Sequence, residues 1–244
     1  GERIIGLHSA LKARFGEGAF RVKTVEIPEE QVEDALWDLF EKMAEEIGEG
    51  DRIFLDITHG FRSIPAISLI ISNYMRILKN MKLSGLYYGG FIPGQGKMPI
   101  YDLTEMLALF EWTQAVDDYL RTGNAKLLLE VMDDRPVVKE EDRLLMELAK
   151  QLNEVSMAIE TCRGRVVEAA VLGVRRQLRL LRESSSPHFK PFQKLLDKIE
   201  RKFEGYRPGE PDDNVLFIVQ WCLDHHLYQQ GYTFLQEGIL TMLA

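Results

Sequence analysis

The sequence predicts an α/β region over residues 1–103 followed by an all-α region over residues 104–244, and two observations lead to this division. In the first region, short runs that alternate apolar and polar residues, as strands do, separate runs with apolar residues at helical spacing. In the second region, amphipathic helical patterns follow each other, and no run is typical of a strand. With 244 residues, 45% of them hydrophobic, the chain can bury one sizeable core or two modest ones.

The first elements are a helix, a strand and a second helix. Residues 2–16 have apolar side chains at helical spacing, and residues 20–27 alternate like a strand. Residues 28–47 show one apolar stripe with acids in the first turn, and Gly48 stands where a helix cap is expected. The sequence therefore predicts a second helix that begins at Pro28.

The remaining elements of the α/β region complete a small sheet. Residues 52–57 are strand-like, and residues 64–80 form a helix that is apolar on most faces, which indicates packing against a sheet. Two further strand-like runs, 83–91 and 98–103, are joined by a Gly- and Pro-rich segment that is typical of a hairpin or loop.

The second region is expected to be helical throughout. Residues 104–123 form its first helix, and residues 137–185 form either one long helix or two helices broken near Gly164 or Gly173. Further amphipathic patterns follow after residue 187 and continue to the end of the chain.

Charge and composition narrow the class of protein. The net charge of −8 means that a polyanionic ligand must be held by a local positive site and not by a broadly basic surface. No apolar run reaches the roughly 18 residues that span a bilayer, and no leader opens the sequence, so we expect a soluble cytoplasmic protein with no membrane partner.

The cysteines and tryptophans are expected to be structural. Cys162 and Cys222 are far apart, with no further Cys or spaced His to complete a zinc set, so we predict free thiols, no metal site and no cofactor. Trp37, Trp112 and Trp221 fall at apolar helix positions and should pack in cores.

The corner between the strand 52–57 and the following helix is unusually polar for a simple connection. In an open sheet, ligands collect at the carboxyl ends of strands, where a helix start presents free N–H groups. Gly60 allows close backbone approach, and Arg62 offers a fork suited to phosphate. The corner therefore predicts a phosphate or nucleotide cradle, and its candidate ligand-binding residues are Asp56, Thr58, His59, Gly60, Arg62 and Ser63.

A purely structural interpretation of the same residues stays open. Asp56 can cap the turn, Ser63 can be a helix N-cap, Arg62 can pair with an acid, and His59 can be a core histidine. Residue chemistry alone does not choose between the two interpretations.

The run from Asp56 to Pro65, DITHGFRSIP, resembles the Asp-x-Thr-His-Gly signature of the CRISPR-associated DxTHG-motif proteins, which serve type III antiviral defence. The resemblance implies that the α/β region is a Rossmann-like CARF sensor domain. It further implies that the corner lines a pocket, shared across a homodimer, for a cyclic oligoadenylate, with cyclic tetra-adenylate as the expected ligand.

Residues 221–241 resemble the helix pair that precedes the nuclease motif in these proteins, which implies an all-α HEPN-like second region. The implied activity is a metal-independent ribonuclease that is activated allosterically and cleaves single-stranded RNA. Against the family pattern, we expect the CARF region to lack its first strand and the HEPN region to be truncated at its C-terminus.

The catalytic residues stay unassigned by sequence. HEPN nucleases place an Arg and a His on a helix with four to six residues between them, and Arg182 and His188 are the one pair with this spacing. Three serines and a proline between them favour a loop, so the pair is a weak candidate. His225 and His226 are expected to be helix-face residues, not metal ligands.

Three functions therefore remain open at the level of sequence. The first is a ligand-activated HEPN ribonuclease. The second is a non-catalytic CARF sensor whose helical region only dimerises or recruits a partner. The third is a ring nuclease that degrades cyclic tetra-adenylate at the Asp56–Ser63 corner itself.

Overall fold

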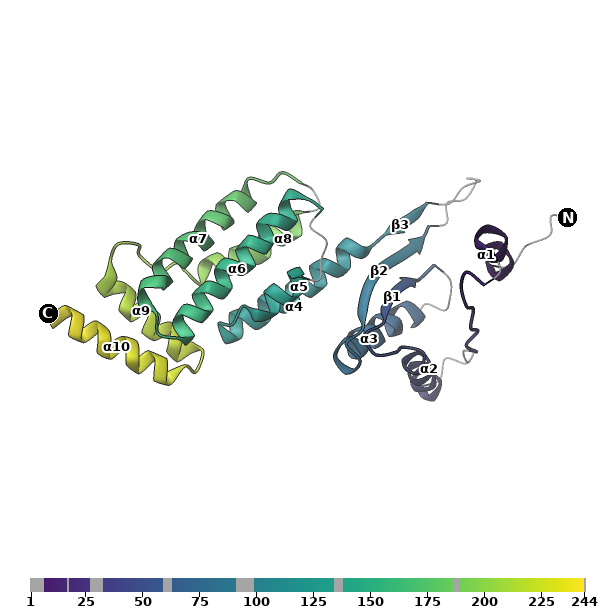
Figure 1. Ribbon diagram of the computed structural model, residues 1–244, viewed down its shortest axis with the longest axis horizontal. Helices are drawn as coiled ribbons and strands as arrows, with labels where there is room; N and C mark the ends of the chain where they lie inside the picture. Colours follow the sequence, from purple (N-terminus) through teal and green to yellow (C-terminus); the bar gives the residue numbers. More distant parts are fainter. Residues whose placement is uncertain are drawn as a thin grey trace. The chain divides into compact units, whose positions relative to one another are not determined.

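The computed structural model describes residues 7–16, 18–26, 33–58, 63–90, 99–133, 138–186 and 189–243. The chain divides into two units, Gly1–Thr104 and Glu105–Ala244 (Figure 1). The first unit holds a small sheet with helices, and the second is built from helices in its described residues. None of the described helices is both long and apolar enough to cross a membrane.

The first unit is a β–α–β crossover extended by one antiparallel strand. Strand β1 pairs in parallel with β2, and β2 pairs antiparallel with β3, in the sheet order β1-β2-β3. A parallel pair needs a long crossover, and α3 supplies it. The elements of this unit are α1 (Leu7–Phe15), α2 (Glu33–Glu45), β1 (Arg52–Asp56), α3 (Ser63–Leu78), β2 (Lys82–Gly89) and β3 (Ile100–Asp102).

The core of the first unit lies between one face of the sheet and the helices α2 and α3, which lie side by side (Figure 1). Ile71 and Met75 of α3 are buried against Ile53 of β1 and Leu83 of β2. Successive strand residues point to opposite faces, so Phe54 lies on the other face, where 62% of it is exposed.

Two expectations for the first unit are wrong in detail. Residues 21–26 have no regular secondary structure, although the segment alternates like a strand, because no described strand pairs with it and an unpaired segment has no hydrogen-bond ladder. Trp37 is 63% exposed and contacts only the edge of the core through the ring of Phe40. The predicted start at Pro28 lies outside the described residues, and α2 is described from Glu33.

The second unit contains seven described helices around one apolar core. Trp112, Tyr119 and Trp221 lie at its centre, which confirms the packing predicted for two of the three tryptophans. The helices are α4 (Thr104–Thr122), α5 (Lys126–Asp133), α6 (Glu140–Glu160), α7 (Gly164–Arg182), α8 (Lys190–Arg201), α9 (Pro211–Asp224) and α10 (Tyr228–Leu243).

The long helical pattern 137–185 is broken near Gly164, one of the two predicted positions. The backbone of Cys162 is left-handed, with φ of 54°, and the N–H of Arg163 donates to the carbonyl of Ala158 at 2.7 Å. The chain thereby ends α6 and turns into α7, and the two helices lie side by side (Figure 1). Gly173 lies inside α7, where a Cβ atom would overlap the side chain of Gln151 on α6.

Candidate functional site

The corner after β1 is held together by an aspartate and a threonine. The Thr58 N–H donates to Oδ1 of Asp56 at 2.8 Å, and the Thr58 hydroxyl donates to the same oxygen. Such a bond from a side chain to the backbone two residues on is a turn that Asp forms readily. Asp56 therefore has the turn-forming role that the structural interpretation of the sequence allowed.

Thr58 also connects this corner to the neighbouring strand. The Gly89 N–H at the end of β2 donates to Oγ1 of Thr58 at 2.7 Å, and the Ile57 N–H donates to the Tyr87 carbonyl at 2.9 Å. A Cβ atom at Gly89 would lie 2.8 Å from Cγ2 of Thr58, so this close approach requires glycine. The carboxyl ends of two parallel strands are thereby fixed side by side, which is where an open α/β sheet binds ligands.

The helix that follows the corner presents its N-terminus to the same end of the sheet. Helix α3 begins at Ser63, and its first turn holds no acidic residue. The first N–H groups and the positive dipole end of a helix favour an anion. His59, Gly60 and Arg62 lie outside the described residues, as does the side chain of Ser63, so their predicted ligand contacts stay predictions.

Aromatic side chains and a second glycine lie next to this corner. The rings of Tyr88 on β2 and Tyr101 on β3 stack with centroids 6.4 Å apart, and 41% and 47% of these residues are exposed. A Cβ atom at Gly90 would lie 2.5 Å from the Tyr101 ring. On the sheet face opposite α3, Phe54 and Tyr87 lie over Gly85. These half-exposed rings offer stacking surface near a strand end, as nucleobase-binding sites do.

Thr58→Val tests the connection between the two strand ends. Valine keeps the shape of threonine but leaves the Gly89 N–H without its acceptor, which costs about 1–2 kcal/mol locally. We expect amide hydrogen exchange in residues 82–89 to become about five- to thirtyfold faster. Thr113→Val removes a hydroxyl that bonds only within α4 and serves as the control. Unchanged exchange in the Thr58 variant would contradict the connecting role.

The second unit places Arg182 in an ion-pair cluster. Its Nη2 donates to Oδ1 of Asp197 at 2.9 Å and to the carboxylate of Glu200, both on α8. His188 lies outside the described residues. A guanidinium that already faces two carboxylates is a poor ligand for a scissile phosphate, because the acids repel that phosphate. Arg182 therefore connects α7 to α8. As in the sequence analysis, it remains only a weak candidate for a catalytic residue.

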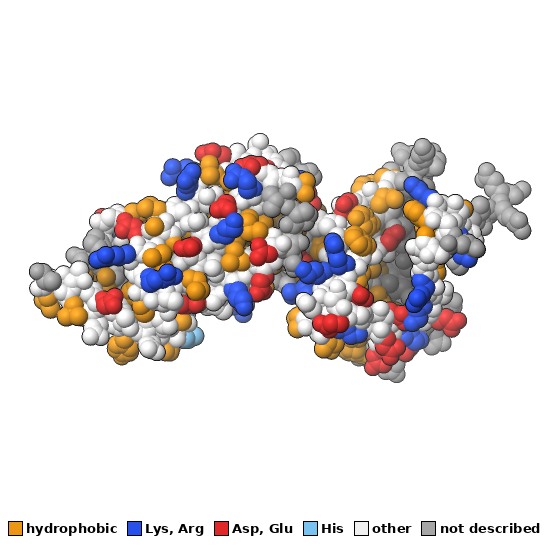
Figure 2. Space-filling view, viewed as in Figure 1, with side chains coloured by type: hydrophobic (Ala, Val, Ile, Leu, Met, Phe, Trp, Pro, Cys, Tyr) orange, Lys and Arg blue, Asp and Glu red, His pale blue; other side chains and the backbone are white. Residues whose placement is uncertain are grey.

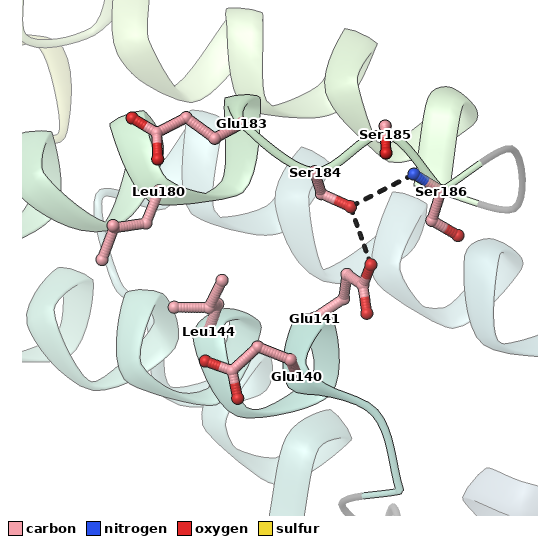
Figure 3. A pocket seen from close by; sticks show the side chains of 8 residues that line it. All are labelled: Glu140, Glu141, Leu144, Leu180, Glu183, Ser184, Ser185 and Ser186. Carbon is pink, nitrogen blue, oxygen red and sulfur yellow. Dashed lines mark hydrogen bonds between the residues drawn. The ribbon is translucent and has the colours of Figure 1, made fainter.

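A pocket of the second unit is lined by acidic residues (Figure 3). It has a volume of about 470 Å³ and lies between the start of α6 and the end of α7. The Ser184 hydroxyl donates to Glu141 at 2.7 Å, and Glu140 and Glu183 line the same space. An anionic substrate is disfavoured here. Across the described residues no group of three or more His, Cys, Asp or Glu is arranged to hold a metal ion.

A lysine and a histidine that sequence reasoning did not connect meet at the ends of three helices. Lys202 Nζ donates to the carbonyl of Leu120 at 2.7 Å and lies 2.7 Å from Nε2 of His225. The amine also lies 4.8 Å from the ring centroid of Trp221. Nδ1 of His225 lies 2.7 Å from the Trp221 carbonyl, which can only accept. We therefore assign the hydrogen to Nδ1, so that Nε2 accepts from Lys202.

The surroundings of Lys202 and His225 disfavour the protonated form of each side chain. Burial lowers the pKa of Lys202 to about 8, and burial also lowers the pKa of His225 from its ordinary value. Asp224 opposes both shifts. Burial raises the pKa of the neighbouring Tyr119 hydroxyl, which has no hydrogen-bond partner in the described structure. A protonated His225 would place a second cation against Lys202, so this contact requires neutral imidazole.

Acidification is therefore expected to destabilise the second unit through His225. Its pKa is lower in the folded than in the unfolded protein, so its contribution to stability is present above pH 6.5 and is lost as the pH falls further. We expect urea unfolding between pH 7 and pH 5 to show a smaller loss of stability in His225→Gln than in the wild type, since glutamine does not titrate. Equal losses in both proteins would contradict this assignment.

Comparison with known proteins matches both units to CRISPR-associated proteins. Residues 3–91 match the CARF domain of the CRISPR system endoribonuclease Csx1, and residues 108–207 match the second domain of CRISPR-associated protein MJ1674. Both units are therefore similar to domains of CRISPR-associated proteins, and the first unit matches a CARF domain, as the resemblance of the Asp56 corner implied.

A curated relative covers most of the chain. CRISPR-associated protein MJ1674 of Methanocaldococcus jannaschii is 28% identical over an alignment of 219 residues that covers 86% of this chain. The chain spans about a third, 32%, of the length of that relative. The CARF assignment and the mostly helical second unit agree with the sequence prediction, whereas the HEPN assignment stays a prediction.

Proposed function

We propose that this protein is a cyclic oligoadenylate sensor of type III antiviral defence that binds cyclic tetra-adenylate at the Asp56–Ser63 corner. The observation that carries the proposal is the position of this corner. It follows a strand of a CARF-type unit, is fixed to the neighbouring strand through Thr58 and Gly89, and precedes the acid-free N-terminus of α3.

The proposal includes a homodimer. A ring of four adenylates has two-fold symmetry, and a single corner contacts only a portion of it. A two-fold axis through the ligand lets two copies of the chain present the same residues to both halves of the ring. The half-exposed rings near β2 and β3 are then available for adenine bases.

Thermal denaturation with and without ligand tests the sensor function. A ligand that binds only the folded state stabilises it by about 2.7 kcal/mol at a concentration of 100 Kd. We expect cyclic tetra-adenylate to raise the melting temperature of the wild type, and linear tetra-adenylate to raise it much less. No shift with the cyclic ligand at any concentration up to the millimolar range would refute the proposal.

We further propose that the helical unit is a HEPN-like ribonuclease that the ligand activates. The supporting observations are the helical structure of the described residues of the second unit and the first unit's match to the CARF domain of a protein named as an endoribonuclease. In HEPN chemistry an arginine holds the scissile phosphate and a histidine orients the attacking 2′-hydroxyl. The ion pairs of Arg182 with Asp197 and Glu200 give no support to that residue in this role.

Cleavage of a fluorescent single-stranded RNA in the presence of cyclic tetra-adenylate and EDTA tests the ribonuclease. For the full-length protein, we expect cleavage that survives both chelation and His188→Ala. Loss of cleavage in a folded His188→Ala protein would show that Arg182 and His188 form the active site. Ligand binding without cleavage by the wild type would favour the binding-only sensor, and linear adenylate products would reveal a ring nuclease.

A further inference from the structure

The basic residues of this acidic protein gather in a limited stretch of the helical unit. The segment from Arg163 to Lys202 contains 11 Lys and Arg against 4 Asp and Glu, whereas the whole chain contains 30 against 38. On the face shown in Figure 2, by contrast, acidic and basic side chains are intermixed over the helices. The excess of positive charge belongs to α7 and α8 and the residues at their outer ends, because the segment 183–189 that connects the two helices contains no Lys or Arg.

Helix α8 arranges four of these cations in one row. Lys190, Lys194, Lys198 and Arg201 are exposed, and their spacing of four, four and three residues places them on one helix face. The opposite face buries Phe192, Leu196 and Ile199 in the core. With a rise of 1.5 Å per residue, neighbouring cations are about 6 Å apart along the axis, and the row is about 16 Å long. We call these four residues the α8 basic row.

The acids that would neutralise this row are engaged elsewhere. Asp197 and Glu200 are the two acids of α8, and both bind Arg182 of α7. Within the described structure, no ion pair of the basic row is observed, although most other lysines of the unit have one. Like charges at this spacing destabilise a helix by about 0.2–0.5 kcal/mol per pair. The arrangement therefore disfavours the free helix and suits a bound polyanion.

We propose that the α8 basic row binds the phosphate backbone of single-stranded RNA. The spacing along the row is comparable to the distance between successive phosphates of an extended single strand. An RNA duplex presents phosphates on both sides of a wide, shallow minor groove, which calls for two rows of cations. An acidic protein segment has a comparable charge repeat only where acids recur every three or four residues along a helix, whereas the phosphates of a nucleic acid recur at every nucleotide. The choice of RNA rests on the proposed ribonuclease function, but the row itself is independent of cyclic oligoadenylate binding.

Fluorescence anisotropy of a labelled 15-nucleotide oligouridine, measured without cyclic oligoadenylate, tests the row. Wild type is compared with the triple variant Lys190→Gln/Lys194→Gln/Lys198→Gln. The control Lys126→Gln/Lys139→Gln/Lys150→Gln changes the net charge equally, but its lysines are exposed elsewhere on the unit and paired with Glu130, Glu105 and Glu147.

For a single strand, each phosphate contact contributes about −0.7 to the slope of log affinity against log salt concentration. Four contacts therefore give a slope of about −3. We expect a slope near −1 and at least about tenfold weaker binding for the triple variant at low salt. The control should bind like wild type. Circular dichroism should show that the triple variant melts no lower than wild type, since the substitutions relieve repulsion.

Equal binding by wild type and the triple variant, equal losses in the variant and the control, or no RNA binding by the wild type would each overturn the proposal. Tighter binding of a 15-base-pair RNA duplex than of the oligouridine would overturn the choice of a single strand. If polyglutamate displaces the labelled oligouridine as well as unlabelled oligouridine does, the choice of nucleic acid is overturned. Because the assay contains no cyclic oligoadenylate, failure of the sensor function would leave these outcomes unchanged.

Discussion

Arg62→Ala is expected to weaken the binding of cyclic tetra-adenylate by about 10- to 150-fold. A charge-assisted hydrogen bond to phosphate is worth about 1.5–3 kcal/mol, and alanine removes it without a substitute. Arg62 directly precedes α3 in the sequence, so we expect its guanidinium to bind the same anion as the first N–H groups of that helix. Isothermal titration calorimetry measures the loss directly.

Arg52→Ala is the matched control for this experiment. Arg52 is an exposed arginine of β1 in the same unit, and its Nε donates to the Ser84 hydroxyl at 3.3 Å. It lies at the opposite end of β1 from Asp56. We expect the control to bind within about twofold of the wild type. An Arg62 variant that binds as tightly as the wild type would remove the corner from the ligand site.

Lys202→Met is expected to destabilise the helical unit by about 1–3 kcal/mol. Methionine keeps an apolar chain against Trp221, but it leaves the Leu120 carbonyl and Nε2 of His225 without their donor. The cost is that of buried acceptors that lose their partner. The loss is partly offset because the buried ammonium, whose pKa burial lowers to about 8, is no longer desolvated.

Urea unfolding at pH 7 measures this effect against Lys198→Met. Lys198 is exposed on α8, only four residues away, and the same substitution there removes the same charge. We expect its stability to lie within about 0.5 kcal/mol of the wild type. If the two variants unfold alike, Lys202 is a solvated surface lysine and the contact with His225 contributes nothing.

The sequence predicted the elements whose signals are local and missed those that depend on a distant partner. The apolar pattern of α3 and the break near Gly164 follow from residues close in the chain, and the structure confirms both. Residues 20–27 have the alternation of a strand, but a strand also needs a neighbour to pair with. The predicted strand is therefore absent from the described residues 21–26.

The candidate site also combines features that local sequence predicts with features that depend on distant residues. The turn-forming chemistry of Asp56 was visible in sequence, because its partner Thr58 is two residues away. The bond between Thr58 and Gly89 spans 31 residues and depends on the parallel register of β1 and β2. Lys202 and His225 are 23 residues apart in the chain, so neither residue alone indicated their contact. Register and helix packing are tertiary properties, which local patterns do not encode.

Calorimetric titration of the wild-type protein with cyclic tetra-adenylate, combined with light scattering of the same sample, tests the central proposal most directly. We predict saturable binding with one ring for two chains and the mass of a homodimer. Linear tetra-adenylate should bind far more weakly, because it lacks the closed two-fold ring. Binding of one ring per monomer, or no heat of binding with the cyclic ligand, would contradict the proposal that two Asp56–Ser63 corners share one cyclic oligoadenylate.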